Sequence, residues 1–202
     1  MEKDSRYLET VPVQVQGSQM DIVEERCADA QTDAIALFER ASRRLLSVNQ
    51  WGEYAGISAF QLIDCYGIRA EREAQEGDYI RIDIPGPGTA MGMGYDWVKI
   101  EEIIAVEEAE EQVLSMTVRP CGHPISEREE TAHFLTRAAT STFIIRRTGL
   151  CVAAEEHGRN EMPNTAEGSF FDKSRNFIVG MAAKLGLSYP QWKSLTKGLL
   201  RD

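Results

Sequence analysis

One polar segment carries the side chains with the clearest potential for chemistry. It reads HGRNEMPN at positions 157–164 and joins the last expected strand to a C-terminal helix. Arg159, Asn160 and Glu161 place a guanidinium, an amide and a carboxyl group side by side. A guanidinium can bind a carboxylate through two parallel hydrogen bonds, so Arg159 and Asn160 could hold an anionic ligand head group. Asn and Pro also build turns, and we expect this structural role ahead of binding.

A second group has the side-chain types of a metal site. Cys121, His123 and His133 offer three soft ligands, and Glu129 or Glu130 could supply a fourth. Zinc sites usually have closer paired ligands, as in CxxC or HExxH. We therefore expect no metal and no other cofactor, and we interpret His133 as a partly buried residue of a short helix that leads toward Phe134.

Motifs for covalent catalysis and phosphate binding are absent from the sequence. There is no GxSxG, and the glycines at 86–88 and 92–94 match neither GxxxxGK[ST] nor GxGxxG in a strand–helix context. An enzyme of cyclase or hydrolase type would have to use Asp83, His133, Arg159 or Glu161 as its acid, base or anion partner.

The four cysteines are widely scattered and form no CxxC pair; they are Cys27, Cys65, Cys121 and Cys151. In a chain of this size the pattern favours reduced thiols and a cytoplasmic location. The N-terminal residues have no basic region followed by an apolar run, so we expect no secretory signal.

Composition narrows the class of partner. The chain has 202 residues, enough for one hydrophobic core, and we expect a single domain over 1–202 with 1–19 as an N-terminal extension. Its net charge of -10 would repel phosphate backbones, so nucleic acid is a poor partner. No apolar run approaches the ~20 residues of a membrane span, so we expect no membrane insertion.

The elements that must position these residues follow from periodicity. Apolar residues at helical spacing predict a helix over 33–48, with a short helix or turn at Trp51 to Ala55. Ile80, Ile82 and Ile84 alternate with polar residues, and apolar residues return from Trp97, which predicts a wide hairpin around 85–95. The apolar residues move from even to odd positions between Ile100 and Ile103, which indicates a bulge in this strand.

The remaining strands are expected at 60–63, 114–118, 140–146 and 150–156, the last two as a hairpin. Residues 11–15 are expected to form a short strand and 20–27 a possible second one, and either or both could belong to the main sheet. A broad apolar helix face is expected over 169–185, followed by an extra helix within 187–202 whose shared face includes Trp192. This order of elements predicts an α+β domain.

The same order resembles the START-like, polyketide-cyclase-like helix-grip superfamily. The resemblance rests on the helix at 33–48 closed by Trp51-Gly52, the meander over 60–156 and the long helix from Ser169. The insertion 121–138 and the terminal helix depart from that pattern. The resemblance implies a curved antiparallel sheet of about six or seven strands, wrapped around the long C-terminal helix with a cavity between them.

The resemblance also implies that the cavity takes a mostly apolar lipid- or polyketide-like molecule. Its expected walls are the inward strand residues and the helix face: Ile80, Ile82, Ile84, Val98, Ile100, Leu114, Met116, Phe143, Phe177, Ile178 and Met181. Trp97 could line the cavity mouth and is equally suited to the core. All of these residues could simply fill a core, because apolar pockets and apolar cores have the same sequence signature.

Three functions stay open. The first is a non-enzymatic carrier of an apolar small molecule with one polar end. The second is a cyclase- or hydrolase-type enzyme that uses the same pocket. The third is a protein-interaction module whose loop 85–95 and Trp192 helix contact a partner, which the Met-rich loop would suit. A homodimer stays open as the assembly.

Overall fold

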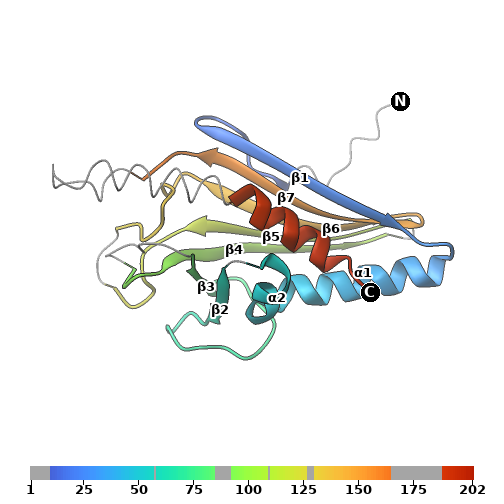
Figure 1. Ribbon diagram of the computed structural model, residues 1–202, viewed down its shortest axis with the longest axis horizontal. Coiled ribbons are helices and arrows are strands. Elements are labelled where there is room, and N and C mark those ends of the chain that lie inside the picture. Colours follow the sequence, from blue (N-terminus) through green and yellow to red (C-terminus); the bar gives the residue numbers. More distant parts are fainter. Residues whose placement is uncertain (1–9, 57, 85–91, 109, 127–129, 165–187) are drawn as a thin grey trace.

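Seven antiparallel strands form one curved sheet in the computed structural model, which describes residues 10–56, 58–84, 92–108, 110–126, 130–164 and 188–202 (Figure 1). The strands are β1 (Ser18–Cys27), β2 (Ala59–Ile63), β3 (Tyr79–Asp83), β4 (Asp96–Glu107), β5 (Glu111–Pro120), β6 (Thr140–Thr148) and β7 (Cys151–Glu161). Their order is β1-β7-β6-β5-β4-β3-β2, so the first strand returns to pair with the last. The α+β interpretation is confirmed.

Helices cover one face of this sheet. They are α1 (Gln31–Leu46), the single turn η2 (Val48–Gln50), α2 (Trp51–Ala55) and helical residues 188–199 at the C-terminus. The buried stripe of α1 has helical spacing, as expected: Ala34, Leu37, Phe38, Ala41 and Leu45. Trp51 is 1% exposed and its indole N–H donates to the Leu45 carbonyl at 3.0 Å, which fixes α2 against the end of α1.

The C-terminal helix is held in place at both ends. Near its start, Gln191 accepts a hydrogen bond from the buried Ser58 hydroxyl at 2.5 Å. Near its end, Arg44 of α1 donates to the Leu199 carbonyl at 3.1 Å, and Gly198 lies against Tyr54, where an added Cβ would come within 2.5 Å of the tyrosine Cβ. The helix expected at 169–185 lies outside the described residues.

The two faces of the sheet alternate strictly along the central strands. Residues on the helix-covered face include Ile80, Val98, Met116 and Phe143, all buried in the main core. Because directly paired residues of antiparallel strands share a face, the Phe143–Glu156 pair also places Glu156 on the helix-covered face. The predicted bulge in β4 is confirmed by a register shift between Ile100 and Glu102.

Several sequence-based expectations about local structure are wrong. Residues 11–15 form no strand, and β1 begins at Ser18, within the expected N-terminal extension. Described residues 130–134 are not helical. Strand β7 continues to Glu161, so residues 157–161 are not a loop: residues 157–159 pair with β6, and residues 157, 158 and 161 pair with β1. The longer strand is favoured because it has a partner on both sides.

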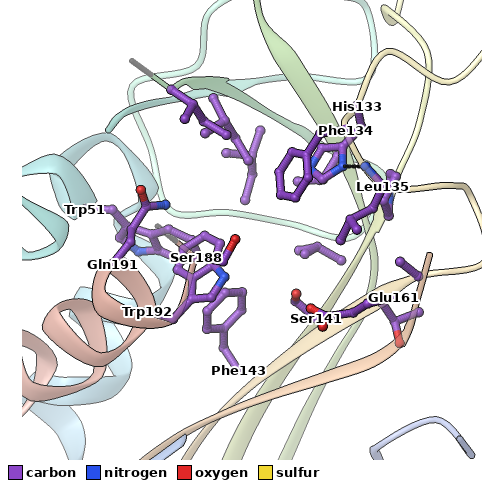
Figure 2. Close-up of a pocket in the computed structure, with 18 residues that line it drawn as sticks. Trp51, His133, Phe134, Leu135, Ser141, Phe143, Glu161, Ser188, Gln191 and Trp192 are labelled. Atoms are coloured by element: carbon purple, nitrogen blue, oxygen red, sulfur yellow. Dashed lines mark hydrogen bonds between the residues drawn. The ribbon is translucent and has the colours of Figure 1, made fainter. Parts of the chain in front are cut away.

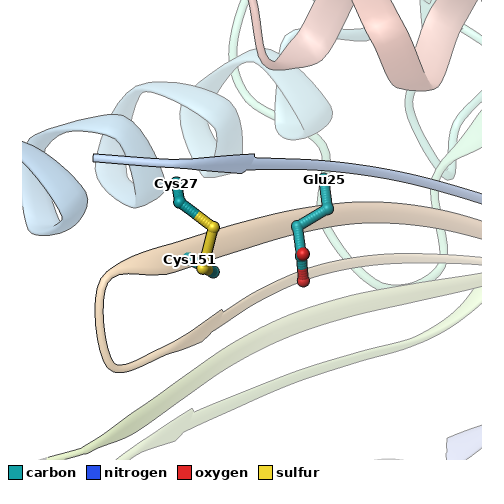
Figure 3. A group of neighbouring side chains, drawn as sticks. All are labelled: Glu25, Cys27 and Cys151. Carbon is teal, nitrogen blue, oxygen red and sulfur yellow. A yellow bond between two sulfur atoms is a disulfide. The ribbon is translucent and has the colours of Figure 1, made fainter. Parts of the chain in front are cut away.

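The structure joins Cys27 and Cys151 in a disulfide, where four reduced thiols were expected (Figure 3). The two cysteines are direct partners at the end of the β1–β7 ladder, although 124 positions separate them in sequence. Cys65 and Cys121 are free thiols. No helix among the described residues is long and apolar enough to cross a bilayer.

Candidate functional site

A small cavity lies between the helix-covered face of the sheet, the C-terminal helix and the inserted segment 133–139 (Figure 2). Its volume is about 40 Å³. The residues that line it come from α2, five of the strands, the insertion and the C-terminal helix: Trp51, Ile80, Ile82, Ile84, Val98, Val118, Pro120, His133, Phe134, Leu135, Ala139, Thr140, Ser141, Phe143, Glu161, Ser188, Gln191 and Trp192. The resemblance implied a cavity between the sheet and the helix at 169–185, which lies outside the described residues; this cavity borders the terminal helix 188–199 instead.

Three aromatic residues make up one wall of the cavity. The ring of Phe143 on β6 lies 5.1 Å from the ring of Trp51 and 5.3 Å from that of Trp192, both distances between centroids. Figure 2 shows Trp51, Trp192 and Phe143 grouped beside the C-terminal helix. Trp192 also packs on Phe60 at 6.0 Å. It faces inward, so it is not a free contact for the interaction-module hypothesis, while loop residues 85–91 lie outside the described residues.

The opposite wall comes from the insertion, which buried polar groups hold in place. The Phe134 amide donates to the Asp96 carboxylate at 3.1 Å, and the Leu135 amide donates to Nδ1 of His133 at 3.0 Å. Asn164 donates through its side chain to the His133 carbonyl at 3.1 Å. Asp96 and Asn164 are buried, so the wall is fixed by groups that water does not reach.

The polar end of the cavity is acidic. Glu161 lines it together with Ser141 and Thr140, and the Thr140 hydroxyl is buried without a hydrogen-bond partner in the described part of the chain. Burial raises the pKa of Glu161 against the opposing effects of the Ser18 hydroxyl and the Arg159 guanidinium. A Cβ added at Gly158 would lie 2.7 Å from Oε1 of Glu161, so the Glu161 carboxyl group would have to shift.

Glu156 extends this acidic end into the protein. Its side chain is fully buried, and among the described residues neither carboxyl oxygen has a well-aligned hydrogen-bond partner. Burial raises its pKa to about 8; the nearby Ser141 hydroxyl acts against the rise, and the Glu161 and Asp21 carboxylates add to it. At pH 7 this carboxyl is therefore mostly protonated. Glu156 does not itself line the open volume, but Phe143, Ser141 and Glu161 around it do.

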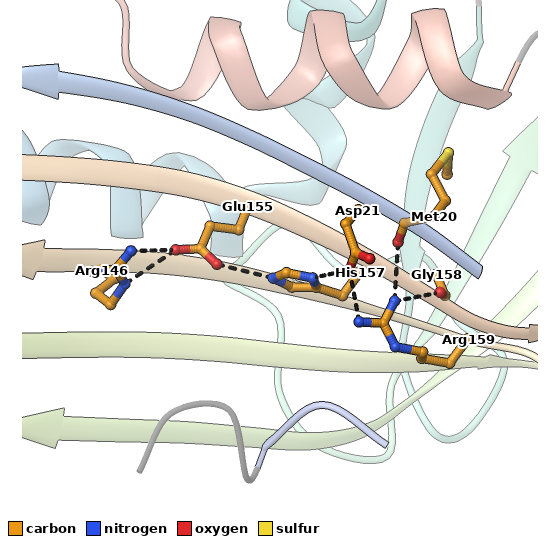
Figure 4. Close-up of polar contacts among 7 residues, drawn as sticks. All are labelled: Met20, Asp21, Arg146, Glu155, His157, Gly158 and Arg159. Carbon is orange, nitrogen blue, oxygen red and sulfur yellow. Dashed lines mark hydrogen bonds and ion pairs between the residues drawn. The ribbon is translucent and has the colours of Figure 1, made fainter. Parts of the chain in front are cut away.

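Arg159 lies away from the cavity, in a chain of charges on the opposite face (Figure 4). Its guanidinium donates to the Asp21 carboxylate at 2.7 Å and to the Met20 and Gly158 carbonyls. His157 bridges Asp21 and Glu155 at 2.6 and 2.9 Å, and Glu155 pairs with Arg146 at 3.0 Å. These contacts agree with the structural role that was expected ahead of anion binding, and a carboxylate of the protein takes the place of the alternative anionic head group.

Asn160 has a structural role in a strand irregularity. It adopts a left-handed backbone with φ of 55°, and its side-chain oxygen accepts from the Val15 and Gln16 amides at 2.7 and 3.1 Å. These bonds fasten the N-terminal segment 13–16 to the end of β7. Asn160 therefore does not line the cavity either.

The other expected ligand-binding residues divide into three groups. Ile82 and Phe143 line the cavity. Met116 is fully buried in the core without reaching the cavity, and Trp97 is buried on the opposite face with Ile63 and Ala132. Phe177 and Met181 lie outside the described residues. Glu156 was missed, although its parity with Val152 and Ala154 along β7 could have shown that it points inward.

The candidate metal ligands are not gathered. Cys121 and His123 line a second cavity, whereas His133 lines the first. Among the described residues, the one metal-compatible group is Glu25, Cys27 and Cys151 (Figure 3). The two sulfurs of that group are joined to each other, and disulfide sulfurs are not thiolate ligands. The absence of a metal requirement stays a prediction.

No protein-family model matches the chain, and no curated protein matches it. Solved structures with a similar fold include hypothetical protein jhp0584 from Helicobacter pylori, at 9% identity and TM-score 0.48 over 89% of this chain and 84% of that chain. Protein Ms6760 from Mycobacterium smegmatis has 13% identity and TM-score 0.42 over 90% and 87%. Ara h 8.0201 has 11% identity and TM-score 0.40 over 92% and 100%. Values this low do not extend a function from those proteins to this chain.

Proposed function

We propose that the protein binds a mostly apolar small molecule, with one hydrogen-bond-donating end, in the cavity between the sheet and the C-terminal helix. The observation that carries this proposal is the acidic end of an aromatic cavity: Glu161 lines it, and Glu156 is fully buried nearby with neither oxygen well hydrogen-bonded within the described part of the chain. Buried polar groups in proteins nearly always have a partner, and an unsatisfied one calls for a ligand or water.

The polarity of this end favours an amine or hydroxyl over a carboxylate. Glu161 and Ser141 line the cavity, and Glu156 is buried close enough to both to be affected by them. The Glu161 carboxylate and the Ser141 hydroxyl can accept hydrogen bonds from an ammonium or hydroxyl group, whereas a carboxylate ligand would add a further acid beside Glu161 and Glu156. The sequence-based choice of an anionic head group at Arg159 is therefore replaced by a donor group at Glu161 and Glu156.

Ligand entry requires the walls to move. A volume of about 40 Å³ holds a few water molecules, well below the 300 Å³ or more of common ligand pockets. Trp192 contacts Phe143 and Phe60 through ring edges and tilted faces, and the Ser58–Gln191 hydrogen bond holds the adjoining turn of the helix. We infer that a rearrangement at Trp192 enlarges the cavity when a ligand binds.

A matched pair of fluorescent probes tests this proposal. A dansyl group on an alkylamine and the same group on an alkylcarboxylate differ only in the polar end. We expect saturable binding of the amine probe, and about tenfold weaker binding of the carboxylate probe. Ile84→Trp fills the cavity from a half-buried position and should abolish binding while the protein stays folded. Equal affinity for both probes, or binding unaffected by Ile84→Trp, would remove the proposal.

A second candidate is an enzyme of cyclase or hydrolase type that uses the same cavity. Glu161 borders it and Glu156 is buried nearby, both with raised pKa values, and a carboxyl with a raised pKa is suited to act as a general acid. This candidate predicts turnover that is lost in both Glu156→Gln and Glu161→Gln.

Location and assembly remain predictions. A cytoplasmic protein would keep Cys27 and Cys151 reduced, so an intact Cys27–Cys151 bond in the isolated protein would favour an oxidising compartment instead. The exclusion of nucleic acid rests on the net charge of -10, and a homodimer stays open.

A further inference from the structure

A second and larger cavity lies on the opposite face of the sheet. It has a volume of about 230 Å³ and is bordered by Tyr79, Lys99, Cys121, His123, Ser126 and Arg137. Tyr79 and Lys99 are direct partners on β3 and β4, and each is next in sequence to a residue that lines the first cavity, Ile80 and Val98. Because side chains alternate along a strand, the two cavities are separated by the sheet itself.

Two cations face this cavity without an acidic partner. Among the described residues, neither Lys99 nor Arg137 has a carboxylate within ion-pair distance. The Lys99 ammonium lies 5.8 Å from the centre of the Tyr79 ring. The nearby Glu101 carboxylate is bound to Arg119 at 2.7 Å. Both cations are exposed, and no carboxylate among the described residues lines the cavity, so its lining carries net positive charge in a chain with 32 acidic and 22 basic side chains.

The other groups at the cavity are neutral. Burial raises the pKa of the Cys121 thiol to about 12. The charges of Lys99 and Arg137 act against that rise, so the electrostatic effect of both cations reaches the thiol at the cavity wall. Burial lowers the pKa of His123, which is therefore uncharged at pH 7. Its Nδ1 accepts from the Ile125 amide at 3.3 Å, which leaves the ring proton on Nε2 as a donor.

We propose that this cavity is a binding site for a compact oxyanion, a phosphate group or a small dicarboxylate, held by Lys99 and Arg137. Arginine binds such groups through two parallel hydrogen bonds and lysine adds a point charge. The site is independent of the apolar cavity, because it takes ligands of opposite charge on the other face of the sheet. It can be present whether or not the first cavity binds a ligand.

Calorimetric titration of the full chain with inorganic phosphate and with malonate tests the site. We compare the wild type with the double variant Lys99→Gln/Arg137→Gln. The matched control is Arg43→Gln/Lys197→Gln, which removes the same charge from two exposed residues far from the cavity in sequence. We expect saturable binding of one anion per chain, weakened about tenfold or more in the cavity variant and less than about twofold in the control.

Each outcome decides the question. Binding of phosphate alone assigns a phosphate site, binding of malonate alone assigns a carboxylate site, and binding of both assigns a general oxyanion site. No saturable binding, or equal weakening in the control, overturns the proposal. If the cavity variant does not fold, amide NMR shifts of the wild type on phosphate addition decide instead: they must centre on Tyr79, Gly122 and His123, and shifts centred elsewhere overturn the site.

Discussion

Phe143 and Glu156 are direct partners across β6 and β7, so the central ring of the aromatic cluster lies beside a buried carboxyl group that has no well-aligned hydrogen bond within the described part of the chain. Such a pairing is costly for an ionised carboxyl, since the ring cannot replace the lost hydration. The acid is tolerated because burial raises its pKa to about 8 and keeps it mostly neutral.

Glu156→Gln should change how stability depends on pH. A carboxyl whose folded pKa lies above its unfolded pKa of about 4.5 binds protons more tightly in the folded state, so the wild type loses stability as pH rises from about 4.5 to 8. That loss amounts to several kcal/mol, at about 1.4 kcal/mol for each pH unit. The variant should lack it. Free energies of unfolding from urea titrations at pH 5, 6.5 and 8 measure the difference.

Glu155→Gln is the matched control, one residue away on the opposite face. Burial alone would raise the pKa of Glu155, but the hydrogen bond from His157 and the charge of Arg146 outweigh burial and lower it. The ionised Glu155 stabilises the folded protein at pH values above the pKa that this carboxyl has in the unfolded chain. The Glu155→Gln variant should therefore lose roughly 3 kcal/mol of unfolding free energy at pH 7. Parallel pH profiles for the wild type and Glu156→Gln would show that Glu156 is not a buried neutral acid.

His157→Gln should destabilise the protein more at pH 6 than at pH 9. Burial opposes protonation, but the hydrogen bonds to Glu155 and Asp21 outweigh it and raise the pKa of His157. The stabilisation is fully present below the unfolded pKa of about 6.5 and is lost as pH rises through the folded pKa. We expect a difference of roughly 1–2 kcal/mol between the two pH values. A deficit that does not vary with pH would mean that the imidazole stays neutral.

The disulfide predicts a specific thiol count. Unfolded protein without a reductant should show two reactive thiols, from Cys65 and Cys121, and four after reduction. Reduction should lower stability by roughly 2–5 kcal/mol, because the bond closes a long loop in the unfolded chain. Cys27→Ser/Cys151→Ser should not respond to the reductant. Four reactive thiols before reduction would contradict the bond and restore the expectation of reduced cysteines.

Arg159→Ala should lower stability and leave the affinity for the amine probe unchanged. The guanidinium binds Asp21 and two carbonyls on the face opposite the cavity. Losing these contacts should cost roughly 1–3 kcal/mol in unfolding free energy. Thermal midpoint and probe affinity measured on the same preparation separate the roles. Weakened binding at unchanged stability would return Arg159 to the ligand site.

The parts of the fold that the sequence predicts are those set by local periodicity. The alternation of Ile80, Ile82 and Ile84 gives β3, and the parity change after Ile100 gives the bulge in β4. The β6–β7 hairpin follows from its turn at Thr148-Gly149. Each of these features depends on residues that are neighbours along the chain, which is why the pattern suffices.

Features that depend on long-range register were not predictable. Cys27 and Cys151 meet because β1 pairs with β7, which no local pattern shows. Arg159 lies on the opposite face because β7 continues past Glu156, supported by strands on both sides. The same extension places Glu156 in mid-strand rather than at a strand end, where an acid would be solvated. Cys121 and His133 are close in sequence yet line different cavities.

The titration of the glutamate carboxyl groups by carbon-13 NMR, with and without dodecylamine, tests the central claim most directly. In the free protein we expect the Glu156 carboxyl to titrate near 8. On amine binding, its pKa and that of Glu161 should fall by more than about one unit, because a nearby ammonium stabilises the ionised forms. A Glu156 pKa near 4.5 in the free protein, or values that dodecylamine leaves unchanged, would contradict an acidic ligand-binding end.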